Sequence, residues 1–192
     1  MSRGTLKKLQ HAFCKWVDGR RKRKMLPCRH ISLGERHTYG TDQKGGTSVA
    51  YSDQELLARI IECEAGGEGD TGMKAVACVV MNRVQVDYGE YGRLHTIREV
   101  VFQKGQFTCA MEMVGGAYNY QNIYNMRPTQ VHYDIANWAI AGNRLTNLGF
   151  ALWFYNPFSV TCRQNFPSSV GQLVIRLGDH CFYNPTDAYA LT

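Results

Sequence analysis

The chain has 192 residues, and its 44% hydrophobic and 11% aromatic content is ordinary for a globular protein and excludes wholesale disorder. This length suits one domain with a buried core, and no apolar stretch approaches the roughly 18 residues of a membrane span. The formal net charge of +6 is unevenly divided, because residues 1–50 hold 12 Lys/Arg and 3 Asp/Glu whereas residues 51–192 hold 10 and 13. The charge therefore predicts a basic leader joined to a slightly acidic domain, and it does not mark that domain as a nucleic-acid binder.

Residues 1–50 are expected to form the basic leader and a flexible linker. Positive charge is densest at Arg20–Lys24, and apolar residues recur at helical spacing between Leu6 and Val17, which predicts a short basic amphipathic helix. Glycines recur through residues 34–48, as in a flexible linker. The segment lacks the apolar core and cleavage site of a secretory signal. We interpret it as a solvated tail or as an arm that docks on an anionic polymer or on a protein partner, and expect no sequence-specific nucleic-acid recognition.

Seven cysteines are present, with no C-x-x-C pair and no local set of ligands that would complete a zinc site. They stand at positions 14, 28, 63, 78, 109, 162 and 181. Cys63 and Cys78 lie in apolar helical contexts, where a free cysteine behaves as a small hydrophobic residue. We therefore expect mostly reduced thiols, a disulfide if the protein leaves the cytoplasm, and neither a metal nor a cofactor.

The predicted domain, residues 51–192, opens with a helix that aims one carboxylate inward. Ser52 and Glu55 have the spacing of a capping box, and Gly66-Gly67 ends the apolar pattern. At about 100° per residue, Glu64 falls in the middle of the apolar stripe and Glu62 on the opposite face. The Gly-Gly pair is expected to turn the backbone and to leave open space beside Glu64.

Glu64 is the strongest candidate for a catalytic residue. Burial and the negative end of the helix dipole both raise the pKa of a carboxyl group in this position, which is how a glycosidase keeps its general acid protonated near neutral pH. The structural alternative is a buried glutamate paired with Arg83. Glu68 and Asp70 are candidates for a second carboxylate, although both also suit the start of the following helix.

The remaining elements change from helices to strands along the chain. We expect a central helix over 71–84 whose Asn82 and Arg83 hold the loop around Glu64. We also expect a short helix over 97–102, a loop at 103–108 suited to sugar binding or to an ordinary connection, and an irregular insertion at 113–126. A helix of about 14 residues should begin at Pro128, and strands are expected at 151–155, 173–177 and 180–183. Gly178-Asp179 predicts a tight hairpin between the last two strands. Helices followed by strands predict an α+β fold.

Six short motifs occur in a fixed order from about Asp53 to Pro185. They are Leu57–Arg59 with Glu64–Gly69 and Gly72, Asn82–Val84, Thr96–Arg98, Gln106–Phe107, Ala151–Pro157, and Gly178 with His180–Tyr183. Together they resemble the spore cortex-lytic cell wall hydrolases of the SleB/CwlJ type. The resemblance implies a compact helical domain with a small antiparallel sheet, similar to lysozyme and the lytic transglycosylases. It also implies cleavage of peptidoglycan between N-acetylmuramic acid and N-acetylglucosamine, with Glu64 as the catalytic acid.

The resemblance further implies substrate contacts and a place of action. The expected substrate-binding residues are Glu68, Gln106, Phe107, Thr108, Trp153, Tyr155 and Asn156. Trp153 is equally well a core residue, and His180 is expected to be structural. The expected location is the spore coat, the cortex or the cell wall, reached after synthesis in the mother cell or after lysis, with a role in cortex breakdown at germination.

The type of reaction and two rival functions remain open at this stage. A retaining or inverting hydrolase needs a second carboxylate about 5–9.5 Å from the first, and none is compelling, so lytic transglycosylation is preferred over hydrolysis. One rival is a non-catalytic glycan-binding or coat-assembly protein that uses the same groove. The other is a Cys–His hydrolase in which Cys109 or Cys181 acts with His132 or His180.

Overall fold

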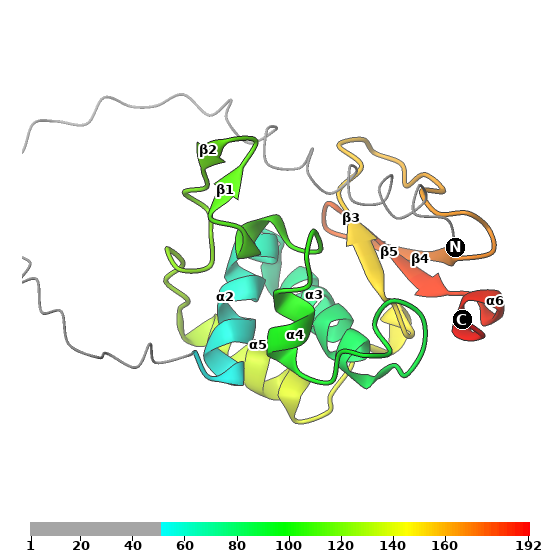
Figure 1. Ribbon diagram of the computed structural model, residues 1–192, viewed down its shortest axis with the longest axis horizontal. Coiled ribbons are helices and arrows are strands. Elements are labelled where there is room, and N and C mark those ends of the chain that lie inside the picture. Colours follow the sequence, from blue (N-terminus) through cyan, green and yellow to red (C-terminus); the bar gives the residue numbers. More distant parts are fainter. Residues whose placement is uncertain (1–50) are drawn as a thin grey trace, which may run out of the picture.

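The computed structural model describes residues 51–192, so the predicted leader lies outside the described residues. Helices gather on one side of the molecule and a three-stranded sheet on the other (Figure 1). The main helices are α2 (Asp53–Ala65), α3 (Gly69–Gln85), α4 (Ile97–Val101) and α5 (Gln130–Ile140), and the sheet contains β3 (Trp153–Tyr155), β4 (Gly171–Leu177) and β5 (His180–Pro185). The smaller elements are η2 (Thr108–Ala110), β1 (Met113–Val114), β2 (Ala117–Tyr118), η3 (Thr146–Leu148) and α6 (Asp187–Ala190). The predicted α+β class is confirmed, and no helix within residues 51–192 has the length and apolarity to cross a membrane.

Helix α2 begins and ends at the predicted residues, but only half of the predicted capping box forms, because the Glu55 carboxylate binds Arg59 and Tyr133. The Ser52 side chain accepts a hydrogen bond from the Glu55 backbone N–H at 3.2 Å, which satisfies one of the donors left free in the first turn. The apolar stripe, including Leu57 and Ile60, is fully buried. Gly66 caps the helix in a right-handed helical conformation, and the next residue with a left-handed backbone is Gly69, at φ +71°. The Gly-Gly pair therefore ends the helix without the left-handed turn that glycine alone tolerates.

Helix α3 is the centre of the core. It is buried on almost every side, and Cys78 and Val79 on its widened apolar face have no exposed surface, as the sequence predicted. The prediction for its last turn needs correction. Asn82 donates to the Ala151 carbonyl at 3.0 Å and Arg83 to the Leu152 carbonyl at 2.8 Å. These hydrogen bonds hold the chain entering β3, whereas the sequence suggested the loop around Glu64.

The sheet is antiparallel, with strand order β3–β5–β4. Phe154 of β3 faces Phe182 of β5, and the β4–β5 hairpin closes at Leu177↔His180 as predicted from Gly178-Asp179. A disulfide joins Cys162 to Cys181 of β5. The other cysteines within residues 51–192 are free thiols at positions 63, 78 and 109, so the expectation of reduced cysteines is right for three of these five.

Two elements differ from the predicted pattern. The segment 113–126, expected to be irregular, contains the β1–β2 hairpin, which projects beyond the end of α2 (Figure 1). The side chains of buried Asn119 and Asn122 donate hydrogen bonds to backbone carbonyls of this region. They satisfy backbone groups that the strands of a longer hairpin would otherwise pair. Helix α5 has 11 residues rather than about 14, because Thr129 forms its capping box one residue after Pro128.

Candidate functional site

Glu64 lies in the last turn of α2 and is buried, with 3% of its surface exposed. The helical wheel predicted this, because the carboxyl group shares its face with residues that have no exposed surface. Glu62, on the predicted wet face, is only partly buried. Low exposure disfavours the ionised form of a carboxylate unless partners compensate. The site is therefore built around one inward-facing acid at the end of a helix.

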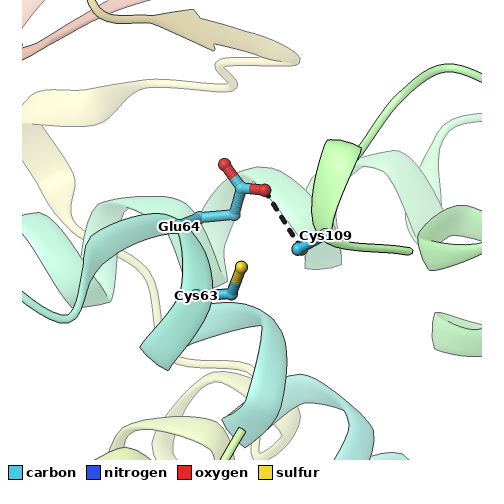
Figure 2. Close-up of side chains that lie close together, drawn as sticks. All are labelled: Cys63, Glu64 and Cys109. Carbon is cyan, nitrogen blue, oxygen red and sulfur yellow. Dashed lines mark hydrogen bonds between the residues drawn. The ribbon is translucent and has the colours of Figure 1, made fainter. Parts of the chain in front are cut away.

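Two cysteines surround this carboxyl group (Figure 2). The Cys109 thiol, from η2, donates a hydrogen bond to Oε1 of Glu64 at 3.1 Å. Figure 2 shows the second carboxyl oxygen pointing away from Cys109, and the Cys63 thiol on the preceding residue of α2. Burial raises the pKa of the Cys109 thiol well above its ordinary value, and the neighbouring Cys63 and Glu64 raise it further. Cys109 is therefore a neutral donor that holds Oε1 of Glu64.

The segment after η2 closes the site from the side of the β1–β2 hairpin. Cys63 donates to the Gln121 carbonyl at 3.1 Å, and the Ile123 N–H donates to the Cys109 carbonyl at 2.8 Å. Arg59 of α2 donates to the carbonyls of Ile123 and Met126, both at 2.8 Å. These contacts bind the segment that follows the β1–β2 hairpin to α2 and η2.

Glu68 has a different environment from the one predicted for a substrate-binding residue. Its Oε2 accepts the Asp179 N–H at 2.7 Å, and its Oε1 lies 3.9 Å from Nδ1 of buried His180. A Cβ placed on Gly178, where φ is +57°, would meet Oε2 at 2.1 Å, so a larger residue here would strain the turn and displace the Glu68 carboxylate. Glu68 therefore links the loop after α2 to the β4–β5 turn. Asp70, the other candidate for a second carboxylate, pairs with Lys74 at 2.7 Å.

Two of the three candidates in the predicted sugar-binding loop are buried in the core. Phe107 and Thr108 are 1% and 5% exposed, and the Arg83 guanidinium lies 5.2 Å from the Phe107 ring centroid. A buried ring offers no face on which a sugar stacks, so Phe107 is not placed as a stacking platform. Gln106 is half-buried and bridges the Tyr91 hydroxyl at 3.1 Å and Oε2 of Glu90 at 3.3 Å.

The β3 candidates divide at the strand end. Trp153 is 4% exposed, donates to Oε1 of Glu90 at 3.4 Å and packs on Phe166 and Tyr189 with centroids 5.0 Å apart, so it is a core residue. Tyr155 and Asn156 are partly exposed, and these two alone of the β3 candidates present surface to a ligand.

The Cys–His hydrolase hypothesis is not supported by this geometry. Cys181 is oxidised in the disulfide with Cys162. Cys109 is buried and its pKa is raised, which disfavours the thiolate that a nucleophilic cysteine needs. His132 is bonded to Thr129 through Nδ1 at the start of α5, and His180 lies beside Glu68.

Sequence reasoning missed two sets of residues at this site. One is the pair Cys63 and Cys109, which are 46 positions apart and meet only through the fold. The other is the exposed aromatic group of segment 113–126, in which Tyr118 and Tyr120 flank Asn119, bonded to Thr108 of η2, whereas the Tyr124 ring packs near Tyr51 at the start of α2. Tyr118, Tyr120 and Tyr124 are 46%, 75% and 44% exposed, and the rings of Tyr118 and Tyr120 pack edge-on at 5.0 Å. Their clustering at every second or fourth position was the available signal.

Comparison with known proteins links the chain to one family. Residues 67–183 match the family model described as cell wall hydrolase. The cell wall hydrolase CwlJ of Bacillus subtilis is 33% identical over 135 residues, which is 70% of this chain and 87% of the relative. CwlJ of Halalkalibacterium halodurans is 34% identical over 138 residues, which is 71% of this chain and 87% of the relative.

Two solved structures share the fold. The catalytic domain of the germination-specific lytic transglycosylase SleB from Bacillus anthracis superposes with a TM-score of 0.51 and 25% identity, covering 73% of this chain and 100% of that domain. The catalytic domain of SleB from Bacillus cereus gives a TM-score of 0.51 and 26% identity over the same shares. The family match begins three residues after Glu64, so the role of Glu64 depends on its geometry.

Proposed function

The chain belongs to the cell wall hydrolase family, and from that premise we propose that it cleaves the glycosidic bond of peptidoglycan by lytic transglycosylation, with Glu64 as the general acid and base. The observation that carries this proposal is the environment of Glu64. Its carboxyl group is 3% exposed at the end of α2, with one oxygen held by the Cys109 thiol. A catalytic acid needs a fixed position and surroundings that favour its neutral form.

The first step is proton transfer to the leaving group. Cys109 donates to Oε1 of Glu64, so the proton of the neutral acid belongs on Oε2, the oxygen that points away from Cys109 in Figure 2. That proton passes to the glycosidic oxygen as the bond to the muramic acid ring breaks. The N-acetylglucosamine side leaves as an alcohol, and the muramic acid ring carries oxocarbenium-like charge.

The second step needs no further carboxylate. A hydroxyl of the same muramic acid residue attacks the charged carbon and gives its proton to ionised Glu64, which restores the acid and leaves an anhydro sugar. The two acidic residues that follow Glu64 support this route over hydrolysis, because Glu68 is bound to the β4–β5 turn and Asp70 to Lys74. Both are engaged in contacts that hold the fold together.

Substrate contacts are proposed for the exposed residues around Glu64. Tyr155 and Asn156 lie at the exposed end of β3. Tyr118 and Tyr120 flank Asn119, which donates to the Thr108 carbonyl of η2, and both rings are exposed. Exposed aromatic rings provide faces on which sugars stack at low cost in conformational entropy. The polymer would therefore run between the end of β3 and the β1–β2 hairpin.

A role in the breakdown of spore cortex is the biological setting that these relatives favour. One structural neighbour is a germination-specific lytic transglycosylase, and the relatives with one-third identity are cell wall hydrolases. We propose that the protein acts at the spore cortex or the cell wall. The basic leader, residues 1–50, would then serve as an arm toward anionic wall or coat material.

The test is mass spectrometry of the muropeptides released from purified peptidoglycan by the full-length protein. Lytic transglycosylation yields products that end in anhydromuramic acid. Products with reducing ends would overturn the transglycosylation step and leave Glu64 as the acid of a hydrolase. Glu64→Gln serves as the inactive control, and release of the same products at the same rate by this variant would overturn the role of Glu64.

A further inference from the structure

The cluster around Glu64 contains more metal ligands than an acid catalyst requires. The Sγ atoms of Cys63 and Cys109 and a carboxylate oxygen of Glu64 all lie within 4.8 Å of one another. They come from α2 and η2, and Figure 2 shows them converging at one place. A fourth candidate ligand is near, because the Gln121 carbonyl oxygen lies 3.1 Å from Cys63 Sγ.

We propose that Cys63, Glu64 and Cys109 form a binding site for a thiophilic divalent metal ion, with Zn²⁺ as the expected ion. Zinc prefers four ligands in a tetrahedron, with bonds of about 2.3 Å to sulfur and about 2.0–2.2 Å to carboxylate oxygen. Tetrahedral ligands at these lengths are about 3.5–3.8 Å apart. The cluster therefore reaches zinc geometry through side-chain shifts of about 1 Å or less. Water or the Gln121 carbonyl completes the four ligands.

The chemistry of the donors selects the metal. Two thiolates and one carboxylate favour zinc over Mg²⁺ or Ca²⁺, which prefer oxygen ligands only. Binding releases the protons of both thiols and the proton of Glu64 when that group is neutral. The free cysteine Cys78 lies outside the cluster, where its sulfur accepts the Leu145 N–H, and so provides a matched control thiol.

Metal binding would inhibit the enzyme, a consequence that rests on the proposed role of Glu64. A carboxylate bound to the ion has no proton to donate to a glycosidic oxygen. The two thiols would thus make the catalytic acid sensitive to metal, and removal of the ion would release it. The binding itself depends only on the cluster and is measured separately from the activity.

Binding is tested by titrating the full-length chain with Co²⁺ in oxygen-free buffer, with Cys14→Ser and Cys28→Ser in every sample so that the leader contributes no thiol. Thiolate ligands give cobalt an intense charge-transfer absorption, and Zn²⁺ should displace the cobalt and abolish it. Cys63→Ala should weaken binding by at least about 100-fold, because loss of an outer-shell partner alone costs 10–100-fold. Cys78→Ala should bind as the parent does. Equal binding and equal absorption in a folded Cys63→Ala protein would overturn the site.

Inhibition is tested with the same proteins on a suspension of purified peptidoglycan. Zn²⁺ should stop peptidoglycan lysis by the parent protein, and EDTA should restore it. The Cys63→Ala variant should remain active at the same Zn²⁺ concentration. Inhibition that persists in EDTA and reverses with a thiol reductant would overturn the metal site in favour of a disulfide. Zinc binding without inhibition would overturn the inhibitory consequence and count against Glu64 as the acid, whereas absence of binding leaves the Glu64→Gln test untouched.

Discussion

Glu64 and Glu68 lie four residues apart on the two sides of the turn after α2, and the structure gives them opposite surroundings. Glu64 is held through one oxygen by a neutral thiol and presents the other away from it. Glu68 uses both oxygens, one on the Asp179 N–H and one beside His180. Glu68 is therefore bound to the β4–β5 turn, whereas Glu64 is held by a thiol from η2.

Burial alone therefore does not identify a catalytic carboxylate. The Glu68 side chain is also largely buried, with 11% of its surface exposed. What separates the two residues is the partner. Glu68 binds a backbone N–H of the β4–β5 turn, a contact that stabilises a fold, whereas Glu64 accepts from a thiol, which is a weak donor.

Replacing Glu64 with Gln should have the largest effect on activity. Loss of a positioned general acid lowers the rate by about 100- to 10,000-fold, while the amide keeps the shape of the side chain and removes the cost of burying a charge. The melting temperature should stay the same or rise. The matched control is Glu62→Gln on the opposite face of α2, which should keep its activity. Equal losses in both variants would mean that α2 was disturbed and would contradict the assignment.

Removing the disulfide tests the three-stranded sheet, the part of the molecule to which Glu68 is bound. Cys162→Ala removes a cross-link that closes a loop with a sequence separation of 19 residues, and loop-closure entropy predicts a loss of about 3 kcal/mol in the free energy of unfolding. Urea denaturation measures the loss, and lytic activity at low temperature should fall by less than about 3-fold. A thiol reductant should destabilise the parent and leave Cys162→Ala unchanged. A parent whose stability does not respond to reductant would contradict the prediction.

Glu68→Gln should lower stability and leave activity nearly unchanged, which is the opposite of the effect expected for Glu64→Gln. The amide oxygen still accepts from the Asp179 N–H, but the hydrogen bond loses its charge and the pairing with His180 is lost. The expected cost is about 1–2 kcal/mol of stability, with activity at low temperature close to that of the parent. Urea denaturation and peptidoglycan lysis measured on the same sample check both parts. A 100-fold loss of activity with unchanged stability would make Glu68 part of the chemistry.

The location of Glu64 was predictable because it depends on local periodicity. Leu57, Ile60 and Ile61 define the buried face of α2, and Glu64 shares that face whatever packs against it. The same holds for the β4–β5 hairpin, since Gly178-Asp179 sets both the turn and the pairing of the flanking strands. Features that depend on residues within about ten positions of one another were therefore predictable from the sequence.

Features that depend on contacts between residues far apart in the chain could not be predicted from the sequence. Cys109 meets Glu64 across 45 positions, and Phe107 is buried because the Arg83 guanidinium and the core lie over it. Both were interpreted from local composition, which is the same for an exposed loop and for one packed under a helix. The disulfide likewise follows from the sheet, which brings Cys181 into register with Tyr155 and leaves Cys162 on the connection that follows β3.

The smallest predicted effect concerns Glu55, at the opposite end of α2 from Glu64. The Tyr133 hydroxyl donates to its carboxylate, and this bond, opposed by burial and aided by Arg59, lowers the pKa of Glu55 below its ordinary value of 4.5. A lowered pKa in the folded state gives stability that is present above pH 4.5 and is lost as the pH falls through the lower value. Tyr133→Phe should flatten the acid part of the stability curve by less than about 1 kcal/mol. Urea midpoints between pH 3 and pH 6 decide the matter, because a variant curve parallel to that of the parent would show that Tyr133 does not hold Glu55 ionised.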